Sequence, residues 1–458
     1  MKKTFAAFAL FASLCVQSSY ADDFNFPVDF SAEDVTAATT MTMPEVWTYD
    51  DCVKWAIANN IDIRSTMLSV LQADENIGMA KDAYLPYVGF STNQSFTNYP
   101  APATGTTGNS YNSSYNVNAS WTIWEGNARK YRLESNKLAK MQQQLYGDDV
   151  VKNLQLGILQ AYLNILYSAE AVIIARQSLE VSTAQAERAK RLMETGRTSR
   201  VDYAQIESQR AQDEYNLVQA QSSYASSKVN MKNLLNLGLD YDLNVEEVNF
   251  SDGMVNAPLP SKTQVFEIAM NWLPQFKSNE LSKSIYDYNI KIAQSTYYPT
   301  ISLNGGLGTG YNSAGRSSWG NQMKNLFNEN IGLSLSVPIY DGNATKRAVS
   351  IAKLQALEYD ITKTQLKNEL SQTIENLYIE SDNSRAKYTT GLTQLEATTL
   401  TAELVDRQFE LGLVNPLELL TAHNNLLNAR LELLQSKYMA ILSSKTIDYY
   451  ATSQISIP

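Results

Sequence analysis

The spacing of apolar residues predicts a helix followed by paired strands in the first part of the chain. Between residues 46 and 84 the apolar side chains recur every three or four positions, as on one face of a helix. Pro86 ends this pattern, because proline lacks the N–H group that a helix interior needs. The period then becomes two, which predicts strands at 87–98 and 110–124, separated by a turn-rich segment.

Each predicted strand has one apolar face and one face of small polar residues. In the strand 110–124 the apolar face holds Tyr111, Tyr115, Val117, Ala119, Trp121 and Ile123, and the other holds Asn112, Ser114, Asn116, Asn118, Ser120 and Thr122. Strands at 300–312 and 330–340 alternate in the same way. The polar faces carry almost no charge, whereas the exposed face of a soluble sandwich usually carries lysine and glutamate. The pattern therefore favours the wall of a membrane β-barrel over a sandwich.

Long helices follow each pair of strands. No proline interrupts residues 127–195, and a heptad pattern runs through Val151, Ile158, Ile165, Val172 and Leu179. With a rise of about 1.5 Å per residue, such a helix would be about 100 Å long. Breaks at 196–199 and 412–416 turn the chain back, which predicts coiled-coil helical hairpins at 126–238 and 342–447.

The two halves of the chain repeat one structural unit. Landmarks recur in the same order, Pro86 as Pro299, Gly126 as Gly342 and Gly196 as Gly412. Because the offset stays between 213 and 216 residues, these landmarks indicate tandem copies at 46–238 and 263–458. Residues 239–262, which include two prolines, form an equatorial link between the copies.

Four strands per chain are too few to close a membrane barrel, since such barrels begin at about eight strands. Several copies must therefore share one barrel, and a trimer would supply twelve strands. The predicted fold is a mixed α+β membrane protein, in which three copies would share a 12-stranded barrel and their helices would form a second cylinder below the membrane.

The first residues predict export from the cytoplasm. Lys2 and Lys3 precede an apolar run, and a small-residue cleavage site ends at Ala21, which is typical of a signal peptide at 1–21. Residues 22–45 show no period and form an N-terminal extension. Cys15 follows Leu14, where a lipid-attachment signal would require a small residue.

Composition and chemistry exclude several classes of function. The chain carries a net charge of −10, so a basic surface for nucleic acid is not expected. His423 is the only histidine, and together with Cys52 it cannot build a zinc site or a catalytic pair. We therefore expect His423 to be a solvated helix residue. The sequence predicts no catalytic, cofactor or metal site, and no enzyme.

These patterns resemble the TolC family of outer-membrane efflux proteins over residues 46–450. The residues that carry the resemblance are Trp47–Cys52, Ala58–Asn60, the paired Ala80–Pro86 and Ala293–Pro299, Val337–Gly342, Phe409–Gly412 and Leu417–Leu420. The opening block is similar to homologues from the Bacteroidetes group. The resemblance implies a homotrimer in the outer membrane of a Gram-negative bacterium, with an α-helical tunnel in the periplasm. A periplasmic adaptor and an inner-membrane transporter of the RND or ABC type would dock on its closed end.

The resemblance also assigns residues to the periplasmic end of the tunnel. Glu418 matches an acidic ring of the aperture, Asp202 a polar partner and Phe409 an aromatic one. Thr421 stands where many relatives carry a second acid, and Val414 where some carry a basic residue, so the ionic lock is weaker here. The helical tips that would contact the adaptor contain Gly196, Ser199, Leu411, Gly412, Leu413 and Asn415.

Alternative interpretations stay open at this stage. Glu418 and Asp202 each lie in the first turn after a break, where an acid also stabilises a helix N-terminus. The predicted function is an outer-membrane channel of a tripartite export system for small toxic molecules. One alternative is that the same duct serves type I protein secretion. Another, from a different class, is an exported structural coiled coil, but the strand pairs fit that interpretation poorly.

Overall fold

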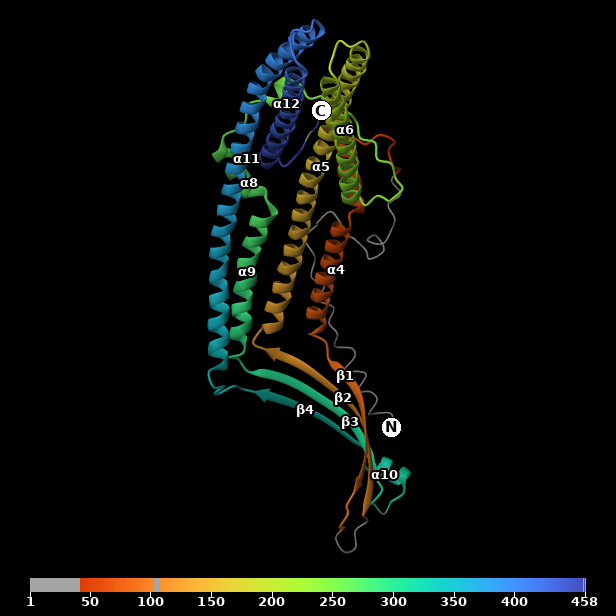
Figure 1. The fold of residues 1–458 in the computed structure, drawn as a ribbon. Coiled ribbons are helices and arrows are strands. Elements are labelled where there is room, and N and C mark those ends of the chain that lie inside the picture. The colour runs from red at the N-terminus through yellow and green to blue at the C-terminus, as the bar shows by residue number, and fades with distance from the viewer. Residues whose placement is uncertain (1–41, 103–107, 316, 456, 458) are drawn as a thin grey trace. The chain divides into compact units, whose positions relative to one another are not determined.

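The computed structural model describes residues 42–102, 108–315, 317–455 and 457 (Figure 1). The predicted signal peptide 1–21 and most of the extension 22–45 lie outside the described residues. The described chain divides into two compact units. The first contains Leu68–Gln144 and Asn279–Ile361, and the second contains Leu145–Ser278 and Thr362–Pro458 together with the residues before Leu68.

A four-stranded antiparallel sheet dominates the first unit. Its strands are β1 (Tyr87–Asn98), β2 (Asn109–Glu125), β3 (Thr300–Asn312) and β4 (Asn328–Ser336), in the order β1-β2-β3-β4. Figure 1 shows the four strands side by side in one curved layer. The central pair joins the two halves of the chain, with Val117 opposite Leu307. Strands β1 and β4 are therefore the edges of the sheet.

The last strand is shorter than the expected range of 330–340. Strand β4 ends at Ser336, and Val337 and Ile339 lie beyond it with exposed side chains. Pro338 explains the difference, because a residue without an N–H group cannot continue a ladder of hydrogen bonds. The apolar alternation in sequence continues past the point at which the backbone can still pair.

Left-handed turns connect the strands to the long helices. Gly126 and Asn127 have φ values of 63° and 67°, and Gly342 and Asn343 have values of 66° and 67°. A Cβ atom on Gly126 would lie 2.5 Å from the Ser295 carbonyl oxygen, so this position requires glycine for space as well as for conformation.

Four helices contribute their ends to the first unit: α4 (Ile61–Asp82), α5 (Ala128–Glu194), α9 (Pro274–Ser295) and α11 (Ala344–Glu410). Polar contacts join neighbours in this unit. Lys140 of α5 lies 2.5 Å from an Asp74 oxygen of α4, and the Tyr359 hydroxyl of α11 donates to Glu280 of α9 at 2.7 Å.

The second unit contains two helical hairpins. Helix α5 pairs with α6 (Arg200–Leu234), and α11 pairs with α12 (Pro416–Thr452). Shorter helices are α3 (Tyr49–Asn59), α7 (Asp252–Val255) and α8 (Lys262–Trp272). The single helix expected at 46–84 is interrupted at Asn60, whose Oδ1 accepts the Asp62 N–H at 2.8 Å and starts α4.

The core of the second unit forms where α3 meets the first hairpin. Trp47, Cys52, Ile158, Tyr162 and Met231 are almost fully buried there. Helix α5 is the one helix among the described residues that is long and apolar enough to cross a membrane, by length and composition alone. Half of its most apolar window is buried in this core, so we interpret α5 as a core helix.

Tyrosine hydroxyl groups attach the link between the two halves to the long helices. Tyr162 donates to the Glu246 carbonyl, Tyr378 to the Pro260 carbonyl and Tyr388 to the Asp252 carboxylate, at 3.2, 2.5 and 2.5 Å. The phenol rings bury apolar area while their hydroxyl groups satisfy polar groups of an irregular segment. The segment after α6 is thereby held against α5 and α11.

Candidate functional site

One face of the sheet is apolar and remains exposed. Val88 and Phe90 on β1 are 56% and 67% exposed, and Ile331, Leu333 and Leu335 on β4 are 64–72% exposed. A soluble protein rarely exposes an apolar surface of this extent, because water solvates such a surface at a cost in free energy. The face is therefore suited to contact with lipid.

Aromatic side chains concentrate towards both ends of this apolar face. At one end Trp124 and Tyr298 are in contact, with ring centroids 6.2 Å apart, and at the other end Tyr111 and Tyr311 lie 6.4 Å apart. Aliphatic side chains occupy much of the region between, among them Val117, Leu303, Leu307 and Leu333. This region is mostly aliphatic but also contains Phe90 and Trp121, opposite Val117 and Leu303. Aliphatic residues bounded by aromatic pairs are typical of strands that cross a bilayer.

The opposite face of the sheet is polar and, apart from Glu125 opposite Thr300 at the end of β2, uncharged. Asn118 and Asn330 flank Gly306 on neighbouring strands, and Asn116 and Asn328 flank Gly308 in the same way. A Cβ atom on Gly306 would lie 3.1 Å from Asn330 Nδ2 and 3.2 Å from Asn118 Oδ1, so the amides occupy the space above the glycine. This face offers hydrogen-bonding groups to water, and it carries no fixed charge between Glu125 at one end and Asn312 at the other.

The second candidate region comprises the two helical tips, which have the same backbone geometry. Gly196 and Gly412 adopt φ values of 75° and 74°. At each tip the next residue donates its N–H to a carbonyl five positions earlier, Arg197 to Leu192 and Leu413 to Gln408. Both turns are therefore Schellman motifs, which require a left-handed residue after the helix.

The predicted aperture acids both take part in helix capping. Ser199 and Asp202 form a capping box, with hydrogen bonds of 3.0 and 3.3 Å. Asn415 Oδ1 accepts the Glu418 N–H at 3.0 Å, and Asn415 Nδ2 donates to the Glu418 carboxylate at 3.2 Å. The capping interpretation thus has contacts within the chain, while the role of Glu418 in an acidic ring remains a prediction.

The remaining residues assigned to the aperture lie on the second hairpin. The Thr421 hydroxyl donates to the Leu417 carbonyl at 2.7 Å, which leaves its methyl group as the distinctive surface. Phe409 packs against a small cluster of the first hairpin, formed by Ala186, Ala189, Tyr203 and Ile206. Phe409 is therefore a contact between the two hairpins.

The expectation that His423 is a solvated helix residue is wrong. Its Nε2 lies 2.8 Å from Asp406 Oδ1, and Gln185 Nε2 donates to the same oxygen at 3.1 Å. One turn further along, Arg188 pairs with Glu410 at 2.6 Å. These groups come from α5, α11 and α12, so they join three helices near the tips. Sequence reasoning missed them because no spacing within one helix shows which helix lies opposite.

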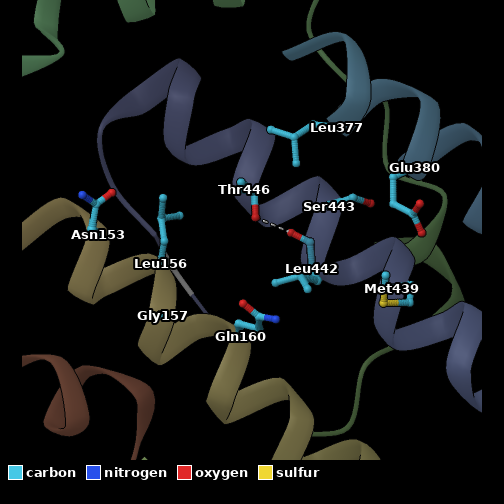
Figure 2. A pocket seen from close by; sticks show the side chains of 10 residues that line it. All are labelled: Asn153, Leu156, Gly157, Gln160, Leu377, Glu380, Met439, Leu442, Ser443 and Thr446. Atoms are coloured by element: carbon cyan, nitrogen blue, oxygen red, sulfur yellow. Dashed lines mark hydrogen bonds between the residues drawn. The ribbon is translucent and has the colours of Figure 1, made fainter. Parts of the chain in front are cut away.

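A cavity in the second unit has a volume of about 430 Å³ (Figure 2). Its lining combines α5, α11 and α12 and consists of Asn153, Leu156, Gly157, Gln160, Leu377, Glu380, Met439, Leu442, Ser443 and Thr446. The Thr446 hydroxyl donates to the Leu442 carbonyl at 2.7 Å, and Ser443 likewise donates within its own helix. No cluster of side chains suited to a metal ion occurs in the described residues.

Comparison with known proteins assigns the family. The model of the family described as outer membrane efflux protein matches residues 53–237 and 269–449. The chain is 21% identical over 392 residues to outer membrane efflux protein BepC of Brucella suis, covering 85% of this chain and 82% of that protein. It is also 21% identical over 397 residues to outer membrane protein TolC of Escherichia coli, covering 85% and 79%.

A solved structure shares the fold. The outer-membrane channel OprN superimposes with a TM-score of 0.70 at 17% sequence identity, covering 88% of this chain and 89% of that one. The family match extends over both halves of the chain, including both helical hairpins. It confirms the resemblance to the TolC family: this chain belongs to the outer membrane efflux protein family.

Proposed function

We propose that three copies of this chain form a passive duct through the outer membrane, as the exit channel of a tripartite export system. One observation carries the proposal: each chain contributes a single four-stranded sheet with two unpaired edges and an exposed apolar face. Unpaired backbone groups are not tolerated in lipid, so β1 and β4 need partners. Identical neighbours supply them in a ring, and twelve strands enclose a lumen lined by the uncharged polar face.

The organisation of the chain supports a duplicated unit. Helix, two strands and two long helices follow one another in each half, and α5 and α11 both have 67 residues. The paired left-handed turns before α5 and α11 add to this similarity. We propose that residues 46–238 and 263–458 are the two copies, joined by an equatorial segment at 239–262, with a cleaved signal peptide at 1–21.

The helical tips are the proposed docking surface for the periplasmic adaptor. Leu411, Leu413 and Leu417 are 66–74% exposed around the second turn. Leucines exposed beside a rigid Schellman turn offer apolar area at little cost in conformational entropy. An inner-membrane transporter of the RND or ABC type would then deliver small toxic molecules. Loss of the gene should lower the minimal inhibitory concentration of such compounds without altering protein secretion, and the reverse result would favour the type I secretion alternative.

Glu418 is the proposed selectivity residue of the aperture. Three symmetry-related carboxylates around a narrow opening raise the local concentration of cations. Glu418→Gln removes the charge and keeps an oxygen for the Asn415 amide, so the cap persists. Asp202→Asn makes the matched change at the other tip.

The test is conductance of the purified trimer in a planar bilayer. We expect a low-conductance, cation-selective channel whose selectivity falls in Glu418→Gln and falls less in Asp202→Asn, because Asp202 is assigned only the place of a polar partner in the aperture. Unchanged selectivity in Glu418→Gln would exclude Glu418 from the selectivity of the aperture and leave helix capping as its role. A protein that is monomeric and water-soluble without detergent would refute the duct itself.

A further inference from the structure

The short helix α10 (Trp319–Asn325) is held at the end of the sheet by a buried glutamine. Strand β4 pairs with β3 only as far as Asn328 opposite Gly308, so β3 extends past it. There Gln322 takes the place of a strand, since its Oε1 accepts the Asn312 N–H at 2.9 Å and its Nε2 donates to the Asn312 carbonyl at 3.0 Å. The Thr309 hydroxyl also donates to the Met323 carbonyl, at 2.6 Å. Helix α10 is thus fixed to the sheet. In Figure 1 it lies beside the end of the sheet that is away from α9 and α11.

The residues of α10 and its C-cap separate into an apolar and a polar side. Trp319, Met323 and the C-cap Leu326 follow one another at the spacing of a single helical face, and Phe327 lies between the C-cap and β4. Three of them, Trp319, Leu326 and Phe327, are 50–55% exposed. Asn321, Lys324 and Asn325 lie on the opposite side and are exposed. The helix therefore presents apolar area outward instead of burying it against the sheet.

This apolar side is continuous with the apolar face of the sheet. Phe327 immediately precedes β4, whose Ile331, Leu333 and Leu335 are exposed. Glu329 of β4 lies opposite Leu307 of β3, so one charged side chain lies on the apolar face close to α10. The aromatic pair Tyr111 and Tyr311 also lies towards this end. Aromatic side chains beside the first charge are typical of the boundary between acyl chains and headgroups.

We propose that α10 lies in the lipid headgroup layer and anchors the outer rim of the duct, an inference that rests on the proposed function. Trp319, Leu326 and Phe327 enter the boundary of the acyl chains, where an indole ring is favoured because one part is apolar and its N–H is polar. Lys324 lies on the water side, where its ammonium group attracts the phosphate groups of lipids. The exposed apolar residues of α10 adjoin the exposed apolar residues of β4, and this continuity favours lipid over a second copy of this chain as the occupant.

The experiment measures the depth of single labelled cysteines in the reconstituted full-length protein. Trp319→Cys, Leu326→Cys, Asn321→Cys and Leu333→Cys are each coupled to an environment-sensitive fluorophore, and buried Cys52 stays unlabelled. Vesicles of phosphatidylcholine and phosphatidylglycerol carry a nitroxide quencher either at the headgroup or deep in the acyl chain. Asn321 is the matched control on the polar side of the same helix, and Leu333 reports the strand face.

We expect headgroup nitroxides to quench labels at 319 and 326 several-fold more strongly than acyl nitroxides do. The label at 321 should be quenched by aqueous iodide, and the label at 333 by acyl nitroxides. If 319 and 326 behave like 321 while 333 is quenched in the acyl region, the anchor is refuted and the duct stands. If 319 and 326 resist both lipid nitroxides and iodide, a neighbouring chain covers them, which also overturns the proposal. A label at 333 that is accessible only to iodide would refute the proposed function itself.

Discussion

At the scale of single residues, Cys52 shows how burial controls chemistry. The side chain is fully buried in the core of the second unit, and this burial, aided by the charge of Asp51, raises the pKa of its thiol to about 12 from an ordinary value of 9.0. Thiolate is the reactive form, so a buried neutral thiol is inert. We expect no reaction of Cys52 with a maleimide at pH 8 until the protein is denatured. Labelling of the folded protein at the rate of a free thiol would contradict the burial.

The same pKa predicts how stability depends on pH. Because the folded state holds the thiol proton more tightly, the stabilisation is complete below pH 9 and is lost as the pH rises towards 12. Between these values the free energy of unfolding should fall by up to about 1.4 kcal/mol per pH unit from this group. Buried tyrosines such as Tyr388, whose pKa is raised to about 12, add to the loss. Comparison with Cys52→Ala isolates the contribution of the thiol.

The junction of His423, Asp406 and Gln185 should stabilise the tips locally. His423→Phe removes the imidazole nitrogen that lies 2.8 Å from both Asp406 Oδ1 and Gln185 Nε2, and it leaves a partly buried carboxylate with fewer partners. A hydrogen bond to a charged group contributes roughly 1.5–3 kcal/mol, so amide hydrogen exchange near residues 400–425 should accelerate about tenfold or more. Asn425→Ala, an exposed change on the same helix, is the control. Equal exchange in the two variants would show that the junction contributes nothing measurable.

At the scale of elements, the two strand-to-helix turns differ in the space around their glycines, and a matched pair of variants can measure the effect on stability. Gly126 and Gly342 share a left-handed conformation, but a Cβ atom on Gly126 would meet the Ser295 carbonyl, whereas one on Gly342 would meet no atom within 4 Å. Gly342→Ala should therefore cost only the conformational penalty of about 1–2 kcal/mol. Gly126→Ala should cost more, because backbone must also shift. Equal losses of thermal stability in the two detergent-solubilised variants would contradict the close approach.

Element boundaries explain how far sequence reasoning reaches. The alternation of apolar and polar residues predicts a two-sided sheet because the period of a strand is a local property. Proline and polar capping residues then set where the elements end or begin: Pro338 follows the end of β4, and Asn60 precedes the start of α4. Membership of the TolC family is confirmed, whereas the aperture role of Glu418 stays a prediction. Contacts such as His423 with Asp406 depend on which helices lie opposite, and no local pattern encodes that.

At the scale of the whole molecule, the proposed duct depends on the two strand edges that one chain leaves unpaired. Strand β1 of one copy must lie beside β4 of the next if three sheets close into a barrel. The uncharged polar face then becomes the lumen, and the apolar band meets lipid. The number of strands predicts that several copies share one barrel, because four strands cannot form a closed wall. The homotrimer is what the resemblance to the TolC family implies.

Disulfide cross-linking between these edges tests the closure directly. Ser334→Cys on β4 is combined in turn with one cysteine on β1, at Gly89, Ser91, Asn93 or Ser95, because all these residues lie on the polar face. Four positions are tried because the experiment must also find the register between β1 of one copy and β4 of the next. Cysteines on adjacent strands can form a disulfide when their Cβ atoms are about 4 Å apart. Oxidation should therefore give covalent trimers for one pair of cysteines in the series. The other pairs should give little cross-linked product. Ser114→Cys on the central strand β2, paired with Ser334→Cys, is the control and should give no cross-link, since β3 separates the two strands. A series that yields only monomers, or covalent dimers as the end product, would exclude a closed ring of three sheets.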